Sequence, residues 1–311
     1  MPRTSEGQQV LIAQITDIHL DFEPGNPSEL NRQRLDMVLA RLMSGPNRPD
    51  LLLVTGDLTD KGDSESYARL EEALASCPFP VYLCVGNHDL RDAFRAQFPN
   101  VPVASGFIQY AIEFDALRIL VLDTLEEGRH GGAFCETRAA WLRATLAERP
   151  DVPTVIAMHH PPTEMGIDWM DTVSQEPWVA RFGRTVWCAD QVKAIVCGHV
   201  HRPIMTLWQG RQLTVCASSS PEVALDFRPI DPDATDGRAM IVAEAPGLAF
   251  HRWDGERLIT HFDVGGQRQI LATYDAKMQA LVRHLLEERP AEAGDPASSL
   301  DWKRPAQSRT A

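Results

Sequence analysis

Basic residues are scarce in this sequence relative to acidic ones. The 311 residues include 30 Lys and Arg against 43 Asp and Glu, which gives a formal net charge of −13 at pH 7. Because nucleic acids and anionic lipid surfaces are themselves negatively charged, this balance argues against either as a partner. A bound metal ion could still create a positive site locally. We therefore expect no nucleic-acid partner and no membrane partner.

Long hydrophobic runs and paired cysteines are also missing. The longest apolar runs, at 51–54, 81–85 and 119–122, are far too short to span a bilayer, and residues 1–10 contain no apolar stretch of signal-peptide length. No CxxC pair occurs, and several of the six cysteines lie in strand-like apolar runs; they are Cys77, Cys84, Cys135, Cys188, Cys197 and Cys216. A disulfide framework is therefore not expected. Together these absences predict a cytoplasmic protein.

The composition provides ample material for a hydrophobic core. Hydrophobic residues make up 44% of the chain and charged residues 23%, as in an ordinary globular protein. Short apolar runs alternate with stretches of helical spacing at 30–42, 64–74 and 137–146. Gly45 is expected to end the first helix, and Ser64 to cap the second. Strands that alternate with helices indicate a layered α/β domain.

The strand pattern predicts a mixed sheet and a second sheet. The apolar runs 108–114 and 117–123 are separated by only two residues, which predicts an antiparallel hairpin. After residue 200 the pattern changes to short strands, which we expect to form a second sheet packed on the first; they lie at 205–208, 213–217, 239–245, 248–253 and 258–264. Helical spacing returns at 274–288, and the tail from Pro290 is expected to be disordered.

Potential metal ligands follow five of these apolar runs directly. They are Asp17 and His19, then Asp57, then Asn87 and His88, then His159 and His160, and finally His199 and His201. Asp and Asn favour turns after strands in any protein, but turns alone explain poorly why so many of the ten histidines stand at such positions. In open α/β sheets, sites lie beyond the carboxyl ends of the strands, so these ligands can converge on one point.

The kinds of ligand in this group restrict the kinds of metal. Imidazole, carboxylate and one amide oxygen, without a thiolate, suit Mn, Fe, Zn or Co better than Mg, Ca or a structural cysteine-zinc site. Seven or eight ligands are too many for one tetrahedral ion. We therefore expect two divalent or mixed-valence metal ions, held together by a shared carboxylate.

The motifs D-x-H, G-D, G-N-H-D, H-H-P-P and G-H-x-H occur in this order within residues 9–203. In this the sequence resembles the calcineurin-like metallophosphoesterase superfamily, and it is most similar to the bacterial branch of class III cyclic-nucleotide phosphodiesterases and glycerophosphodiesterases. The resemblance implies an α/β fold of four layers (α/β/β/α), in which two mixed β-sheets pack as a sandwich flanked by helices. A catalytic domain would span 1–265, followed by a C-terminal helix and tail at 266–311.

The resemblance also implies a role for each ligand. One ion is expected at Asp17, His19 and His201, a second at Asn87, His159 and His199, with Asp57 bridging the two. His159 is preferred to His160 because it comes first after its strand. His88 is expected beside the phosphate, where it stabilises charge or protonates the leaving oxygen, and Asp89 is expected to orient the His88 ring.

The implied activity is hydrolysis of small phosphodiesters, such as cyclic nucleotides including cAMP, or glycerophosphodiesters. Two ions lower the pKa of a bridging water, so that hydroxide can attack phosphorus near neutral pH. A phosphomonoesterase of the same fold and a non-catalytic binding scaffold are the alternatives. A nuclease is disfavoured by the net charge, and a protein phosphatase by Asp89, because that branch usually carries Glu after the Asn-His pair.

The sequence leaves the roles of several segments undecided. His130 and Ser218–Ser220 either reach the substrate or lie in ordinary loops, and the segment 163–178 is either a wall of the pocket or a loop packed on the sheet. The apolar stripe from Met278 to Leu286 either packs within its own domain or forms the contact of a homo-oligomer. No motif in the final third names a substrate.

Overall fold

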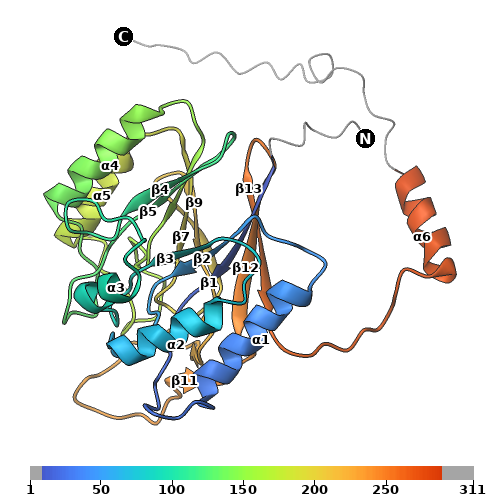
Figure 1. Ribbon diagram of the computed structural model, residues 1–311, viewed down its shortest axis with the longest axis horizontal. Helices are drawn as coiled ribbons and strands as arrows, with labels where there is room; N and C mark the ends of the chain where they lie inside the picture. Colours follow the sequence, from blue (N-terminus) through green and yellow to red (C-terminus); the bar gives the residue numbers. More distant parts are fainter. Residues whose placement is uncertain (1–8, 289–311) are drawn as a thin grey trace. The chain divides into compact units, whose positions relative to one another are not determined.

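The computed structural model describes residues 9–288 (Figure 1). The chain divides into two compact units, 1–266 and 267–311, and the second contains the helix α6 (Ala276–Glu287). This helix is capped by Asp275, whose side chain accepts hydrogen bonds from the N–H groups of Lys277 and Met278. The expected tail from Pro290 lies outside the described residues. Between residues 9 and 288, no helix is both long and apolar enough to cross a membrane.

The first sheet has the strand order β13-β12-β1-β2-β3. Strands β1, β2 and β3 run parallel, while β12 is antiparallel to both β1 and β13, so the sheet is mixed as predicted. The bounds are β1 (Val10–Ile15), β2 (Leu51–Thr55), β3 (Val81–Cys84), β12 (Gly247–Trp253) and β13 (Leu258–Val264).

The second sheet has the order β4-β5-β6-β7-β9-β8. The predicted hairpin is present as the antiparallel pair β4 and β5, and β5, β6, β7 and β9 run parallel. The bounds are β4 (Tyr110–Glu113), β5 (Arg118–Val121), β6 (Thr154–Ala157), β7 (Val192–Cys197), β8 (Ile204–Trp208) and β9 (Arg211–Val215). A short ribbon pairs β10 (Glu222–Val223) with β11 (Ile241–Val242).

Apart from the two-stranded β10–β11 ribbon, the strands after residue 200 join the two larger sheets and do not form a sheet of their own, which corrects the sequence-based expectation. Strands β8 and β9 extend the second sheet, whereas β12 and β13 return to the first, where β12 pairs with β1. The expected strand 239–245 is reduced to the two residues of β11. Pairings across such long stretches of chain leave no periodic signal in the sequence.

The two sheets pack face to face, and helices cover their outer faces. In β5, Ile119 and Val121 belong to the core between the sheets, while the alternate residue Leu120 packs on the opposite side with Leu142 of the helix α4 (Glu136–Glu148). This alternation follows from the two-residue period of a strand. The fold is the predicted four-layer α/β/β/α sandwich.

The helices agree with the prediction in part. The helix α1 (Leu30–Ser44) ends at Gly45 as expected, but α2 (Ser64–Leu74) is capped by Asp63, one residue before the predicted Ser64. Two helices were not predicted, α3 (Arg91–Gln97) and α5 (Pro177–Val186). The first is only seven residues long, too short for a clear helical period.

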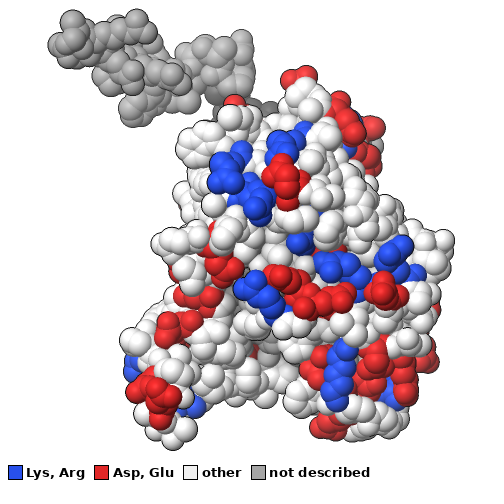
Figure 2. All heavy atoms as spheres, turned by 90° about the vertical axis from the view of Figure 1, so that its left-hand side faces the viewer, with Lys and Arg blue, Asp and Glu red and all other residues white. Residues whose placement is uncertain are grey.

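Charges of both signs alternate over the face shown in Figure 2. On the helix α4, Arg143 and Glu136 form an ion pair, and Glu148 lies 3.1 Å from Arg118 of β5. Lys and Arg therefore form no continuous basic surface on this face of the described chain. The expectation that the protein has no nucleic-acid partner stays a prediction.

Arg34 of α1 ties the helix to the loop that follows β9. Its guanidinium donates hydrogen bonds to the carbonyl oxygens of Ser219 (2.8 Å), Ser220 (2.9 Å) and Glu244 (2.6 Å). The same loop is held against the end of β1, because the N–H of Ser220 donates to the carbonyl of Asp17. One buried side chain thus fixes a segment next to the strand ends.

We expect Arg34→Leu to lower the melting temperature by about 10 °C, because the buried carbonyl oxygens of Ser219 and Ser220 and the carbonyl oxygen of Glu244 would lose a charged donor. Arg32→Leu on the same helix is the matched control, since Arg32 pairs with the exposed Asp36. Its effect should stay within about 0.5 kcal/mol. Equal shifts in thermal unfolding for the two variants would contradict the role given to Arg34.

Candidate metal centre

Five of the seven predicted ligands have a left-handed backbone, which is uncommon for residues other than glycine. Their φ angles are +50° for Asp17, +46° for His19, +46° for Asp57, +75° for His199 and +58° for His201. Such a conformation costs about 1–2 kcal/mol per residue and persists only where the surrounding structure enforces it. The chain therefore bends sharply just where these side chains must turn toward one another.

Two glycines allow the strand-end loops to approach closely. A Cβ atom on Gly86 would lie 2.8 Å from Nε2 of His159, and one on Gly198 would lie 2.9 Å from Oδ2 of Asp17. Both distances are too short for real contacts, so a side chain at either position would displace a predicted ligand. This explains the glycines in the G-N-H-D and G-H-x-H motifs.

Asp17, His19 and His201 meet as one group of ligands. Nε2 of His19 lies 3.1 Å from Nε2 of His201, which in turn lies 3.6 Å from Oδ1 of Asp17. The other nitrogen of His201, Nδ1, is 2.9 Å from the carbonyl oxygen of Pro221. The carbonyl holds the ring so that Nε2 faces the other two side chains.

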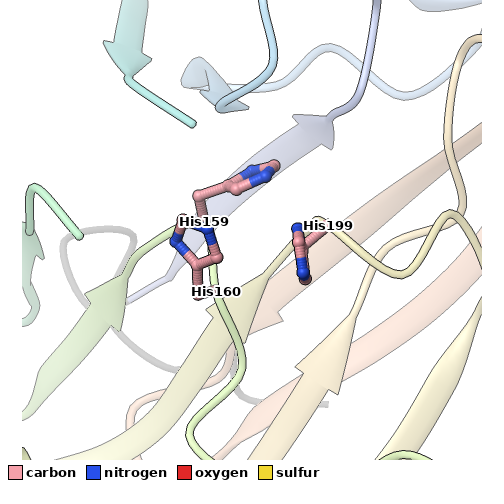
Figure 3. Close-up of side chains that lie close together, drawn as sticks. All are labelled: His159, His160 and His199. Carbon is pink, nitrogen blue, oxygen red and sulfur yellow. The ribbon is translucent and has the colours of Figure 1, made fainter. Parts of the chain in front are cut away.

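Asn87, His159 and His199 form the second group, although they come from three different loops. Oδ1 of Asn87 lies 3.1 Å from Nε2 of His159 and 3.0 Å from Nδ1 of His199. Nδ1 of His159 is fixed by the carbonyl oxygen of Thr55 at 2.8 Å. Figure 3 shows His159 and His160 on the loop after β6, with His199 beside them on the loop after β7.

Asp57 stands between the two groups. Its Oδ2 lies 3.5 Å from Nε2 of His19 in the first group and 3.3 Å from Nε2 of His159 in the second. Its Oδ1 accepts a hydrogen bond of 2.8 Å from the N–H of His88. Oδ1 of Asp17 also approaches Nε2 of His159, but only to 3.9 Å. Asp57 is therefore the closer link between the two groups.

These residues fit two divalent cations. The facing atoms are ring nitrogens, carboxylate oxygens and an amide oxygen, which are ligand atoms for such ions, and overlapping groups of the nitrogens and carboxylate oxygens lie within 4.8 Å of one another. His159 and His201 each use Nδ1 on a backbone carbonyl, which leaves Nε2 for an ion. This arrangement, with the second ring nitrogen hydrogen-bonded, is usual for metal-binding histidines.

His160 is buried next to this site but has both ring nitrogens engaged. Nδ1 lies 2.8 Å from Oγ1 of Thr124, and Nε2 lies 3.1 Å from the carbonyl oxygen of His130. Burial holds the pKa of His160 well below its usual value. The contacts therefore favour His159 as the ligand, and the choice between the two remains a prediction.

Asp89 does not orient the His88 ring, which corrects the expected role. Its carboxylate accepts hydrogen bonds from the N–H of Gly86 (2.8 Å) and from the hydroxyl of Tyr67 (2.9 Å), and burial raises its pKa to about 7. The His88 ring is held instead by Asp60, whose carbonyl oxygen lies 2.8 Å from Nδ1. Asp60 follows the G-D motif by three residues, but no motif marked it.

Burial and neighbouring charges shift the pKa values of several side chains in the site. Burial raises the pKa of Asp17 to about 6 and lowers that of His201 to about 4. Burial also opposes ionisation of Asp57 and His159, but their mutual attraction prevails, lowering the pKa of Asp57 and raising that of His159 to about 9. Divalent ions require neutral imidazoles, so binding an ion would release the proton of His159.

A cavity of about 460 Å³ lies at the predicted metal ligands. Two residues that the sequence left open, His130 and Ser220, line it, as do Trp169 and Met170 from the segment 163–178. The remaining wall is formed mainly by apolar side chains that belong to no motif. Their places in the sequence gave no signal, because only the folded chain brings them to the same cavity.

The fold and the site together define a class of protein: an α/β/β/α sandwich with two groups of metal ligands at its strand ends. The sequence profile described as calcineurin-like phosphoesterase matches residues 10–203. The chain therefore belongs to the calcineurin-like phosphoesterase family, whose members use a binuclear metal centre, and the predicted family is confirmed.

Relatives agree with this assignment. A protein of Arcobacter nitrofigilis named "probable glycerophosphodiester phosphodiesterase" is 31% identical over 81% of this chain and 92% of its own length. A "probable cyclic nucleotide phosphodiesterase" of Rhodopseudomonas palustris is 34% identical over 74% of this chain and 82% of its own. The crystal structure of a dimetal phosphatase from Danio rerio shares the fold, with a TM-score of 0.54 and 15% identity over 81% of this chain and 98% of that one.

We expect His159→Gln to lower the bound metal from two ions per chain to one or none, because Nε2 of His159 faces Asp57 and Asn87. His160→Gln is the matched variant and should keep both ions, since neither ring nitrogen of His160 is free. The measurement is metal content by elemental mass spectrometry on folded protein. Loss of metal in His160→Gln alone would reverse the assignment.

Proposed function

We propose that this protein hydrolyses small phosphodiesters at a two-metal centre held by Asp17, His19 and His201 on one side and by Asn87, His159 and His199 on the other. The observation that carries the proposal is Asp57, whose carboxylate contacts both groups. The prediction of a phosphodiesterase is confirmed by the relatives named above. Cyclic nucleotides and glycerophosphodiesters are the substrate classes those names suggest.

The ligand set supports Mn, Fe, Zn or Co as the metals of this centre. When bound, two divalent ions lower the pKa of a water molecule and neutralise the negative charge of the phosphate. The protein's contribution is to place the ligands, and the carbonyl oxygens of Thr55 and Pro221 do so by fixing the rings of His159 and His201.

We infer that His88 acts on the leaving oxygen. It lines the cavity, its backbone N–H is bound to Asp57, and Nδ1 is turned away toward the carbonyl of Asp60. Nε2 is therefore the ring nitrogen available to the substrate. Oδ1 of Asp60 also lies 3.8 Å from Nδ1, on the side of the ring away from Nε2.

The cavity supports a diester over a monoester. A monoester is a dianion near neutral pH, whereas a diester carries one negative charge. Among the described residues that line the cavity, none is Lys or Arg, while Glu23, Glu29 and Asp60 contribute carboxylates. The phosphomonoesterase alternative would need further positive charge beyond the metals. A binding scaffold without activity is less well supported, because every predicted ligand position is filled.

The six cysteines are all free thiols, and Cys84, Cys197 and Cys216 are buried. Free thiols are typical of a reducing compartment. This supports the cytoplasm as the proposed location. The limits of the catalytic domain, 1–265, and of the C-terminal helix and tail, 266–311, stay predictions. The formation of a homo-oligomer also stays a prediction.

The test of the activity compares bis(p-nitrophenyl) phosphate with p-nitrophenyl phosphate, using metal-stripped protein resupplied with Mn²⁺. We expect manganese-dependent hydrolysis with a higher kcat/KM for the diester. Asp57→Asn should abolish it, whereas Asp36→Asn, which changes an exposed carboxylate on α1, should not. A preference for the monoester would establish the phosphomonoesterase alternative, and no turnover of either ester with two ions bound would favour the scaffold.

We expect His88→Ala to keep both ions but to slow diesters with alkoxide leaving groups by about 100-fold or more, because these groups need a proton. Activated p-nitrophenyl esters leave without one and should lose much less. The comparison of kcat for the two kinds of ester, with metal content as the control, measures this difference. Equal losses would limit His88 to stabilising charge.

A further inference from the structure

Apolar side chains line the same cavity as the predicted metal ligands. They include two aromatic rings and are called the apolar wall here, although Glu23, Glu29 and Asn31 also line the cavity; the side chains are Phe22, Leu30, Trp169, Met170, Val223 and Ile241. A substrate whose phosphate lies at the metal ligands must place the rest of its structure against this wall.

The segment that carries Trp169 is anchored to the core. Met170 and Ile167 beside it are buried, and the carboxylate of Asp171 accepts hydrogen bonds from the N–H groups of Met165 (2.6 Å) and Gly166 (3.1 Å). These contacts fix the loop on both sides of Trp169. Its ring remains partly exposed and lines the cavity.

Phe22 lies in a loop that is closed in a similar way. The buried carboxylate of Glu29 accepts hydrogen bonds from the N–H groups of Asp21 and Glu23, the residues on either side of Phe22. Phe22 is itself 63% exposed. An exposed aromatic ring on a fixed loop that lines a cavity is a contact surface that no core packing accounts for.

Polar groups near this wall are already engaged within the chain. Glu29 is occupied by the two N–H groups just described, and Nδ2 of Asn31 donates to the carbonyl oxygen of His19 at 2.8 Å. A small polyhydroxy alcohol would therefore have to compete with these contacts at Glu29 and Asn31, although Oγ of Ser220, which also lines the cavity, has no hydrogen-bond partner in the described chain. A second anionic group would find no Lys or Arg among the described lining residues.

We propose that Trp169 and Phe22 form an aromatic subsite that binds an uncharged ring, such as a nucleobase, on the non-reacting part of the diester. The inference rests on the proposed phosphodiesterase function and deepens it. It makes these two residues determinants of specificity, and it predicts a preference for ring-bearing diesters over glycerol esters. Base–aromatic stacking strengthens binding severalfold or more per base.

The test keeps the leaving group constant and changes only the other ester group. The probes are methyl p-nitrophenyl phosphate, phenyl p-nitrophenyl phosphate and thymidine 5′-(p-nitrophenyl phosphate), each with Mn²⁺-loaded protein. We expect the two ring-bearing esters to show about a tenfold higher kcat/KM than the methyl ester. Equal values for all three would overturn the inference and leave the phosphodiesterase function in place. No hydrolysis of any ester would overturn both.

Variants of Trp169 and Phe22 test whether these two side chains cause the preference for ring-bearing esters. Trp169→Ala should lower kcat/KM about tenfold for the ring-bearing esters and leave the methyl ester within about twofold. Trp169→Phe should restore part of the loss. Phe22→Ala tests the exposed ring without a packing cost, and Trp187→Ala, 65% exposed and outside this cavity, is the matched control. Equal losses for all three esters in both alanine variants of the subsite would overturn the proposal.

Discussion

Two buried carboxylates, Asp17 and Asp57, are the constraint on which the rest of the structure depends. Asp17 is fully buried and Asp57 is 2% exposed, and burying charged groups costs several kcal/mol each unless they are paired. Their described neighbours are imidazoles, amides and backbone N–H groups, with no Lys or Arg among them at the cavity. The metal ions of the family's binuclear centre would balance this charge, and the left-handed backbone at the predicted ligands is the conformational cost of bringing these side chains together.

The two-sheet architecture makes this convergence possible. Strands β1, β2 and β3 of the first sheet and β6 and β7 of the second all end at the same edge, so their loops meet although they lie far apart in the sequence. The N–H of His199, after β7, donates to both oxygens of Asp17, after β1, at 3.0 Å. The antiparallel strands contribute no ligands. They complete the sheets, and the β10–β11 ribbon contributes Val223 and Ile241 to the apolar wall.

Much of the site could be predicted from the sequence because each ligand follows an apolar run directly. The chemistry of Asp17, His19 and their counterparts is encoded locally, within a few residues of a strand end. Contacts formed across long distances were not predictable in the same way. Asp60, which holds His88, carries no motif, and Asp89 proved to bind Tyr67 and backbone groups instead. The return of β12 to pair with β1 likewise depends on tertiary packing that no local period reveals.

The type of reaction and the choice of substrate differ in the same way: local motifs predict the first, but the second depends on the folded cavity. Metal ligands that polarise one phosphate ester will polarise another, so the motifs alone leave monoester, cyclic nucleotide and glycerophosphodiester equally open. Side chains outside the motifs therefore determine which of these substrates the protein prefers. In this protein those side chains include the aromatic Phe22 and Trp169, on loops fixed by Glu29 and Asp171, and no Lys or Arg is among the described residues that line the cavity. Among diesters, a cavity of this kind discriminates by the group attached to the phosphate, because every diester presents the same singly charged phosphate.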